Sequence, residues 1–386
     1  MQFGFNREQT QLRAEVKAFV EREFTPEALA EFESGLGPGP AARDFYKKLG
    51  ARGWLTVSWP KRYGGLEGSH TDQLIVSDEL AYHGVKSNEV GSSMVGPTIL
   101  LCGSEELKDE WLPQISASNV LFALGYTEPN AGSDLASLEM RAVEDGDDYV
   151  VNGAKMFNTG THYADYHWLG ARTDPDVPKH KGVSLFIVDL KSPGISVKPL
   201  WVLNGRRTNV VYYDNVRVPK RNLVGQKNRG FYHIATALDF ERMLPSGGLR
   251  RDFHNLVAAV KKTIVDGRPL GKDPMVRQAM AELAAEVDIA NLMSYRIVWL
   301  TDNGTVPNTE SSMQKLYLTE LEGRIGDVAM KIFGPTAMLR KGSKWAPADE
   351  GVGLKNYLNS YISAIYGGTN EIQRNVIATR GLGLPR

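Results

Sequence analysis

Hydrophobic residues recur with the period of an amphipathic helix in the first third of the chain. One face of the first such segment is formed by Leu12, Val16, Phe19 and Val20. A second segment of the same kind covers residues 72–82. The loop between them, GWLTVSWPKRYGGLEGS, is rich in glycine and proline, which indicates a tight excursion. The pattern predicts a helical region over residues 1–118.

The pattern changes at about residue 119. Asp145-Gly146 and Asn152-Gly153 are typical of two-residue hairpin turns, and the run DDYVV between them favours a strand. Further strand candidates, separated by turn signals, are MFNTG, YHWLGAR, GVSLFIVDL, GISVKPL and VVYYDNVRV. We therefore expect a compact antiparallel β-domain over residues 119–229.

Helical periodicity returns after Gly230 and continues to the end of the chain. One apolar stripe consists of Met280, Leu283, Ala284, Val287 and Ala290. A second consists of Leu354, Tyr357, Leu358, Tyr361, Ile362 and Ile365. Long helices that pack on one another form a bundle, so residues 230–386 are predicted to be helical. The predicted fold class is α+β, with helical, β and helical domains in that order.

The charge balance and the cysteine content limit which kind of binding partner and which cellular compartment we expect. Lysine plus arginine total 45 and aspartate plus glutamate total 45, so no net field favours nucleic acid or an anionic membrane. We expect a small-molecule partner. The single cysteine, Cys102, the absence of a secretion signal in MQFGFNREQTQLRAEVKAF and the lack of a long apolar run predict a soluble, cytoplasmic protein without membrane insertion.

Several common catalytic motifs are missing. The chain has no G-x-G-x-x-G after a strand, no G-x-x-x-x-G-K-[ST], no H-E-x-x-H and no C-x-x-C. The seven histidines are scattered, which favours ordinary surface or interior roles. No metal site is predicted.

Three strings carry candidate chemistry. The first, GYTEPNAGSD over residues 125–134, can bring backbone N–H groups and hydroxyls close to a phosphate or a heteroaromatic edge, although such a loop is usually only a connection. The second, MFNTG, adds an aromatic ring and a hydroxyl beside it. In the third, YGGTNEIQR, Asn370 and Gln373 have capping-box spacing at a helix start, where free N–H groups can bind an anion or a carbonyl oxygen.

A carboxylate precedes a proline on the helix after Gly230. Pro245 cannot donate a hydrogen bond to the carbonyl of Glu241, four residues earlier. This spacing predicts a kink at a carboxylate, a candidate active-site feature.

Over nearly its whole length the chain resembles the acyl-CoA dehydrogenase family. Five strings match in order: G-W-x-x-x-x-W-P-x-x-Y-G-G, TEPNAGSD, NGAKMFNTG, DNVRVPKRNLVG and YGGTNEIQR. The resemblance implies an N-terminal helical domain, a middle β-domain and a C-terminal four-helix bundle. It also implies FAD as cofactor, an acyl-CoA thioester as substrate and electron transfer to an electron-transferring flavoprotein.

The resemblance also implies roles for individual residues. The FAD-binding residues would be Leu124, Tyr126, Thr127, Gly132, Ser133, Phe157, Thr159 and Thr369. The substrate would contact Ser133, Arg242, Tyr366 and Gly367. Thr127 would hydrogen-bond the isoalloxazine, whereas Phe157 and Thr159 would line its edge near N5, the hydride acceptor. Ordinary core packing of Phe157 and a strand-to-strand contact of Thr159 are the alternatives.

The resemblance further identifies a candidate base. Many family members carry a glutamate directly after the tyrosine of the C-terminal loop, where this chain has Gly367. A minority use a glutamate on the first bundle helix in a D-x-E-R context, and here Glu241 matches it. The alternatives are a surface-paired Glu241, and Glu371 as a competing carboxylate. A carboxylate in an apolar pocket is tuned toward neutrality, as a base requires.

Gly367 keeps a possible role through its backbone. In the family, this N–H and a ribityl hydroxyl of FAD bind the thioester oxygen and stabilise the developing enolate. A glycine at this position also leaves room beside the reacting carbons. We therefore expect a bulky, branched or cyclic acyl group.

Two strings depart from the family pattern in ways that bear on assembly. The family's R-x-x-F-G reads Gly267-Arg268-Pro269-Leu270-Gly271 here, and its Q-x-F-G-G-x-G begins Lys331-Ile332-Phe333-Gly334-Pro335. The segment TDP…KHKGVSLFIVDLKSPGI resembles paired bacterial subunits that act on sterol side chains and ring-containing acyl-CoAs. An α2β2 heterotetramer with a related subunit and a homotetramer are both open. So are two other functions, a flavin-dependent oxidase or monooxygenase and a structural subunit.

Overall fold

The computed structural model describes residues 4–86, 89–241, 244–346 and 351–385, with residues 236–241 described in their backbone only. The chain divides into two compact units. The first comprises Met1–Lys17, Leu74–Val85 and Arg242–Arg386, and the second comprises Ala18–Gln73 and Lys86–Glu241. This division does not follow the order of the three predicted domains, whose boundaries stay a prediction.

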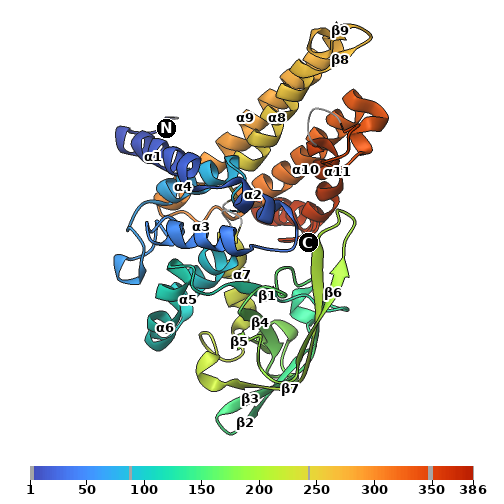
Figure 1. Ribbon diagram of the computed structural model, residues 1–386. Helices are drawn as coiled ribbons and strands as arrows, with labels where there is room; N and C mark the ends of the chain where they lie inside the picture. The colour runs from blue at the N-terminus through green and yellow to red at the C-terminus, as the bar shows by residue number, and fades with distance from the viewer. Residues whose placement is uncertain (1–3, 87–88, 242–243, 347–350, 386) are drawn as a thin grey trace. The chain divides into compact units, whose positions relative to one another are not determined.

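A seven-stranded sheet forms the centre of the second unit (Figure 1). Its strand order is β1-β4-β2-β3-β7-β6, and β5 pairs with β4. The strands are β1 Phe122–Gly125, β2 Arg141–Asp145, β3 Asp148–Lys155, β4 Tyr166–Arg172, β5 Val183–Asp189, β6 Ile195–Trp201 and β7 Arg207–Pro219. The β-domain predicted from the turn signals is confirmed. Most pairs are antiparallel, but β4 runs parallel to both β1 and β2.

One of the two predicted hairpin turns is present. The Asp145–Asp148 turn joins β2 to β3, and Gly146 takes a φ of +60° there. The prediction of a second turn at Asn152-Gly153 is wrong, because both residues lie inside β3. The register against β7 shifts between Val151 and Gly153, whose φ is +143°. The glycine signal therefore marks a bulge, an alternative use of glycine in a strand.

Two hydrophobic cores lie on opposite faces of the sheet. Along β5, Val183, Leu185 and Ile187 belong to one core, whereas Phe186 and Val188 belong to the other. Because strand side chains alternate in direction, a strand buried on both faces reads as a continuous apolar run. This explains the nearly continuous apolar sequence VSLFIV, in which Ser184 is the polar exception.

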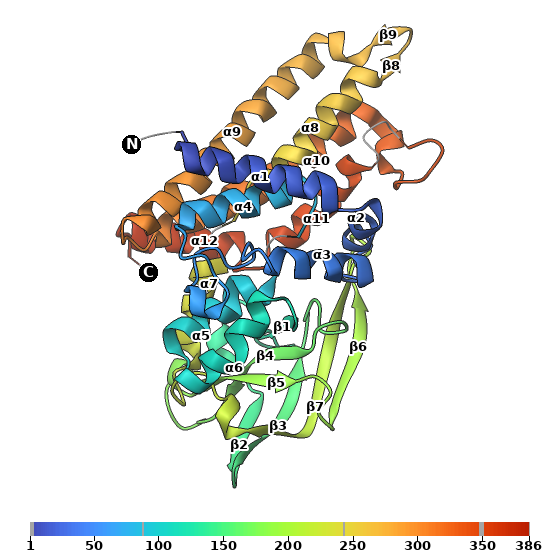
Figure 2. The same ribbon diagram turned by 60° about the vertical axis from the view of Figure 1, so that its left-hand side comes forward.

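The second unit also contains α-helices beside the sheet (Figure 2). They are α2 Pro26–Glu33, α3 Pro40–Gly50, α5 Gly96–Cys102, α6 Glu105–Ser116 and α7 Gly230–Glu241. α1 Arg7–Glu23 and α4 His70–Tyr82 contribute residues to both units. The predicted loop between α3 and α4 buries Trp54, Trp59 and Tyr63 in the core. A Cβ on Gly96 would lie 1.9 Å from the Trp59 ring, so this packing requires glycine.

The first unit is built mainly from helices after residue 243. They are α8 Gly247–Lys262, α9 Pro274–Asp302, α10 Asn308–Phe333, α11 Val352–Ser363 and α12 Asn370–Val376. A short hairpin, β8 Ile264–Val265 and β9 Arg268–Pro269, joins α8 to α9 (Figure 1). The predicted α9 stripe is confirmed, since Leu283, Val287 and Ala290 are buried in the helical core. The predicted helical, β, helical fold class is likewise confirmed.

The stripe predicted on α11 is not the buried face. Tyr361 is 52% exposed, whereas the buried positions of this helix are Gly353, Asn356 and Ser363. A Cβ on Gly326 of α10 would lie 2.4 Å from the backbone nitrogen of Tyr357. The two helices therefore approach through small and polar residues rather than through large apolar ones.

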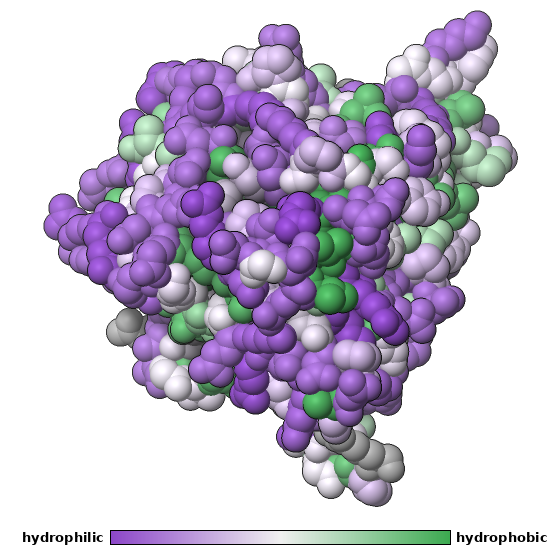
Figure 3. Space-filling view, turned by 90° about the horizontal axis from the view of Figure 1, so that it is seen from below, coloured by the Kyte–Doolittle hydropathy of each residue, from purple (hydrophilic) through white to green (hydrophobic). Residues whose placement is uncertain are grey.

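The surface of the protein is mainly polar where Figure 3 shows it, with hydrophobic side chains in small separate groups. In the described parts of the chain, no helix is both long and apolar enough to cross a membrane.

Candidate active site

The loop after β1 is the first predicted element of the site. Leu124 is half-buried in β1, and Tyr126 is buried just after it. The N–H of Met156, which follows β3, donates to the carbonyl of Thr127 over 2.8 Å. Glu128 and Ala131 exchange backbone hydrogen bonds of 2.9 and 3.2 Å. The loop is therefore a tight, hydrogen-bonded turn.

A buried ion pair fixes this loop to β3. Lys155 Nζ donates to Glu128 Oε1 over 2.7 Å and to the Tyr126 carbonyl over 3.0 Å. The Glu128 carboxylate also accepts the N–H groups of Glu139 and Met140, over 2.6 and 3.0 Å. Burial lowers the pKa of Lys155 to about 8, although Glu128 opposes this shift. The motifs did not predict this pair; a lysine inside a buried strand was its signal in the sequence.

The tip of the loop is open. Gly132 and Ser133 are exposed, and a Cβ on Gly132 would meet nothing within 4 Å. Asp134 anchors the far side through Lys179 and through the Ser137 hydroxyl at 2.6 Å. Lys179 lowers the pKa of Asp134, with a further contribution from Ser137. The loop thus presents small residues on a backbone held at both ends.

Phe157 and Thr159 follow β3 in a loop rather than in a strand, so the strand expected at MFNTG is wrong. Phe157 has a left-handed backbone (φ +59°), which ends the strand, and its ring is 54% exposed. Core packing therefore does not account for Phe157. Thr159 is exposed, and its hydroxyl donates to that of Thr208 over 3.2 Å, the strand contact considered as its alternative.

His167 of β4 is a second buried polar group, and it lies beside β1. The Nδ1 atom of His167 lies 2.6 Å from the Tyr213 hydroxyl, and Nε2 lies 3.4 Å from that of Thr161. Burial, with nearby Lys155, lowers the pKa of His167 to about 3, so its imidazole is neutral. A Cβ on Gly125 would lie 2.8 Å from this ring, which accounts for the first glycine of GYTEPNAGSD.

In the first unit, Gln373 shapes the C-terminal glycine loop. Gly367 and Gly368 have φ angles of +64° and +88°, and the Gln373 amide donates 3.1 Å hydrogen bonds to both of their carbonyls. The predicted capping box of Asn370 and Gln373 is wrong. Thr369 is the N-cap residue of α12, and its hydroxyl accepts the N–H of Ile372 over 3.2 Å.

The same loop is anchored to α10. Buried Asn370 accepts hydrogen bonds from Lys315 Nζ at 2.9 Å and the Thr319 hydroxyl at 3.0 Å. The loop is therefore fixed at Gly367 and Gly368 by Gln373 and, just after them, by Asn370. Within the described residues, the N–H of Gly367 makes no hydrogen bond, and the Tyr366 side chain is 52% exposed.

Glu371 and Glu241 occupy different helix ends. Glu371 is exposed in the first turn of α12, where its own N–H and the Thr369 hydroxyl lower the pKa of its carboxylate. Glu241 is the last residue of α7. Its side chain and Arg242 lie outside the described residues. Because α8 starts only at Gly247, Pro245 lies between two helices rather than at a kink within one.

Both altered strings lie at helix ends of the first unit. Asp266 and Gly267 form the tip of the β8–β9 hairpin with φ angles of +50° and +76°, and Arg268 follows in β9. The second string ends α10 at Phe333 and continues through Gly334, whose φ is +58°.

Comparison with known proteins assigns the family. Family models of the acyl-CoA dehydrogenase N-terminal, middle and C-terminal domains match residues 6–119, 123–216 and 228–382. The chain belongs to the acyl-CoA dehydrogenase family. It is therefore an oxidoreductase that uses FAD, as the resemblance in its motifs implied.

Individual acyl-CoA dehydrogenases are similar to this chain in sequence and in structure. The chain is 37% identical to Acyl-CoA dehydrogenase FadE29 of Mycobacterium tuberculosis over 98% of this chain and 97% of that protein. It matches the structure named Tcur3481-Tcur3483 steroid ACAD with a TM-score of 0.92 and 35% identity, over the full length of both chains. The ChsE4-ChsE5 complex from Mycobacterium tuberculosis matches with a TM-score of 0.91 and 35% identity, again over both full lengths.

The residues of this acyl-CoA dehydrogenase fit the FAD that its family requires. The second unit offers an exposed aromatic ring at Phe157, hydroxyls at Thr127, Ser133 and Thr159, and unobstructed backbone at Gly132. An exposed aromatic ring with hydroxyls and open backbone nearby suits a flat heteroaromatic ring carrying phosphates.

Proposed function

We propose that this acyl-CoA dehydrogenase introduces an α,β double bond into a bulky, branched or cyclic acyl-CoA, with Glu241 as the α-proton base. The observation that carries the proposal is Gly367, which has no side chain where many relatives carry the base, and whose φ of +64° favours glycine. The D-x-E-R context of Glu241 supplies the missing carboxylate. The steroid named in the Tcur3481-Tcur3483 structure supports a ring-containing acyl group.

The proposed roles account for both the proton and the hydride that the substrate loses. The α-carbon loses its proton to Glu241, and the electron pair left behind becomes part of the new double bond as the β-carbon loses a hydride. Bound FAD supplies the acceptor for that hydride. The N–H of Gly367 stabilises negative charge on the thioester oxygen, since a fixed backbone donor is most valuable where charge develops. Gln373 and Asn370 support this role by holding the loop at and just after Gly367.

We assign cofactor and substrate contacts on the same basis. The proposed FAD-binding residues remain Leu124, Tyr126, Thr127, Gly132, Ser133, Phe157, Thr159 and Thr369. The proposed substrate-binding residues remain Ser133, Arg242, Tyr366 and Gly367. The exposure of Gly132, Ser133, Phe157 and Tyr366 supports these assignments, because each is accessible to a ligand.

We further infer that electrons pass to an electron-transferring flavoprotein and that the protein assembles as a tetramer. The Tcur3481-Tcur3483 and ChsE4-ChsE5 structures are named as pairs of different chains, which favours an α2β2 heterotetramer over a homotetramer. The altered strings at 267–271 and 331–335 agree with a need for a related subunit. Co-expression with such a subunit, followed by sedimentation and flavin quantification, distinguishes the two assemblies.

The decisive experiment compares Glu241→Gln with Glu371→Gln. The amide keeps the shape of the side chain but cannot accept the proton, so Glu241→Gln should lower the rate of anaerobic flavin bleaching by at least about a hundredfold. The Glu371→Gln control should remain near wild type, because that carboxylate serves a helix end. A Glu241→Gln enzyme within about tenfold of wild type, at equal flavin content, would rule out Glu241 as the base.

The same assay identifies the acyl group and separates reaction classes. A panel of short, long, branched and steroid-derived CoA thioesters should bleach the flavin fastest where the acyl group is bulky. A flavin-dependent monooxygenase would show no bleaching by any thioester without oxygen, and a structural subunit would contain no flavin.

A further inference from the structure

A pocket in the first unit is lined by cationic groups that the dehydrogenase reaction does not use. The pocket has a volume of about 530 Å³, and its walls come from α1, α4 and α8. The lining residues are Thr10, Arg13, Ala14, Lys17, Glu79, Tyr82, Arg250 and His254. This volume lies within the range typical of small-molecule sites.

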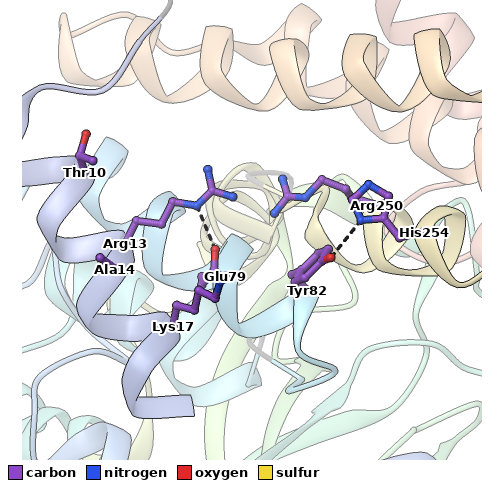
Figure 4. Close-up of a pocket in the computed structure, with 8 residues that line it drawn as sticks. All are labelled: Thr10, Arg13, Ala14, Lys17, Glu79, Tyr82, Arg250 and His254. Carbon is purple, nitrogen blue, oxygen red and sulfur yellow. Dashed lines mark hydrogen bonds and ion pairs between the residues drawn. The ribbon is translucent and has the colours of Figure 1, made fainter. Parts of the chain in front are cut away.

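Two arginines face one another across this pocket. Figure 4 shows the guanidinium of Arg13, from α1, and that of Arg250, from α8, extending toward each other. Arg13 uses Nε to bind Glu79 over 2.9 Å, which leaves its terminal nitrogens directed toward Arg250. Two like charges that face one another repel each other. An anion bound between them attracts both, so the electrostatic energy becomes favourable.

Asp78 and Tyr82 hold the side chain of Arg250 in place. Its side chain is only 15% exposed, and Nη2 lies 2.9 Å from Asp78 Oδ2. That distance suits an ion pair, but the N–H is not aligned with an acceptor, and Nη2 makes no hydrogen bond within the described residues. The Tyr82 ring lies 5.0 Å from the guanidinium carbon and stacks against it. The Asp78 ion pair and the Tyr82 ring thus preorganise the side chain, whose guanidinium faces the pocket (Figure 4).

The cationic groups and the aromatic rings of the pocket indicate which class of ligand it binds. Arg13, Lys17 and Arg250 line the pocket as cationic groups, and the two arginines contact Glu79 and Asp78, respectively. Tyr82 and His254 form one wall, with the tyrosine hydroxyl 2.9 Å from Nδ1 of the histidine (Figure 4). Aromatic walls beside a cationic centre suit an organic group that carries an anion.

We propose that this pocket binds a small organic phosphate, with the phosphate between Arg13 and Arg250 and the organic group against Tyr82. Guanidinium forks match phosphate oxygens in pairs. A carboxylate has two oxygens in one plane and is satisfied by one fork, whereas a tetrahedral phosphate presents oxygens to donors on opposite walls. The proposal concerns a second ligand site and does not depend on the choice of base.

Titration calorimetry of the FAD-loaded enzyme at low salt tests the proposal with phenyl phosphate and benzoate as matched probes. We expect phenyl phosphate to bind saturably at one site per chain, at least about tenfold more tightly than benzoate. Inorganic phosphate should bind more weakly than phenyl phosphate, because it lacks the ring. Benzoate binding as tight as phenyl phosphate would overturn the choice of phosphate, and no saturation by about 10 mM would overturn the site.

Substitutions of pocket residues test whether phenyl phosphate binds at this pocket. Lys17→Glu places a carboxylate at the exposed rim, and Arg13→Gln removes one fork; each should weaken phenyl phosphate binding at least about tenfold. Arg296→Gln is the control, because Arg296 forms a comparable ion pair with Glu310 at 3.3 Å outside the pocket. Exposed Lys17 can change without disturbing the core, so Lys17→Glu decides the matter if Arg13→Gln fails to fold. Unchanged affinity in Lys17→Glu would overturn the proposal.

Discussion

Lys155 and Glu128 form a 2.7 Å ion pair in the interior of the second unit, with the lysine side chain fully buried. The pair joins the end of β3 to the loop that carries Thr127 and Ser133. Both partners make further hydrogen bonds to backbone groups, so neither charge is left unsatisfied. A paired and hydrogen-bonded buried charge fixes geometry, because every alternative arrangement leaves a charge without a partner.

Replacement of Lys155 by methionine should therefore be costly. The change leaves the Glu128 carboxylate buried without its cation, which typically costs about 3–5 kcal/mol of unfolding free energy. We also expect weaker FAD binding, because the loop loses its anchor. Urea unfolding and flavin retention measure the two effects.

Arg217→Met is the matched control for Lys155→Met. Arg217 pairs with Asp145 at 2.9 Å and with Asp148 at 2.8 Å, but its side chain is more than half exposed, so its loss should cost much less than that of Lys155. Similar losses in the two variants would show that burial of the Lys155 pair does not determine its contribution.

A second prediction concerns the backbone of Gly367. An alanine at a φ of +64° is strained, so Gly367→Ala should lose about 1–2 kcal/mol of unfolding free energy. If the N–H of this residue binds the thioester oxygen, the turnover number should fall as well. Anaerobic flavin bleaching and thermal unfolding measure these effects separately.

Gly304→Ala controls for the strain alone. Gly304 has a φ of +76° and open space around its α-carbon, so an alanine there meets the same backbone penalty and no clash. Its stability loss should resemble that of Gly367→Ala while bleaching stays normal. Because alanine keeps the N–H, a Gly367→Ala enzyme with full activity would mean that glycine is not needed at a φ of +64° to direct that N–H at the thioester oxygen.

Some patterns in the sequence predicted the structure correctly, and others did not. The α9 stripe and the Asp145–Asp148 turn are correct because burial and turn chemistry act locally there. The Asn152-Gly153 signal has two structural uses, a hairpin or a bulge, and only the pairing with β7 selects the bulge. On α11, the close approach at Gly326 buries small residues in place of the apolar stripe.

The candidate site shows the same limit. Motif resemblance pointed to the loops around Thr127 and Gly367, but not to the groups that hold them. Lys155 contacts Glu128, 27 positions away, which only the tertiary fold brings close, whereas Gln373 turns back on Gly367 within one short loop. The capping-box spacing of Asn370 and Gln373 was misleading, because Thr369 takes the cap and releases Gln373 to bind the glycine carbonyls.

A third prediction tests Gln373 as a positioning residue. Gln373→Leu keeps the volume but removes both hydrogen bonds to the glycine loop, so the turnover number should fall about tenfold. The pH dependence of bleaching should keep its shape, since the base is unchanged. Gln278→Leu, which removes an exposed contact to Glu282, should leave turnover unaltered. Equal turnover in both variants would remove Gln373 from the mechanism.

The last prediction concerns the pH dependence of stability through Glu89 in the second unit. Burial raises the pKa of Glu89 to about 7, despite N–H donors from Gly91, Ser92 and Phe122. The folded state therefore holds this proton more tightly than the unfolded state. The resulting stability is fully present below about pH 4.5 and is lost as the pH rises through about 7.

Comparison of wild type with Glu89→Gln isolates this contribution. His167 acts in the opposite direction, because its lowered pKa of about 3 makes stability rise with pH up to about 6.5. The difference in unfolding free energy between the two proteins removes that shared term. Relative to Glu89→Gln, wild type should lose on the order of 1 kcal/mol or more between pH 5 and pH 8. A difference that stays constant over this range would mean that Glu89 is ionised throughout, because an unshifted carboxylate has already lost its proton at pH 5.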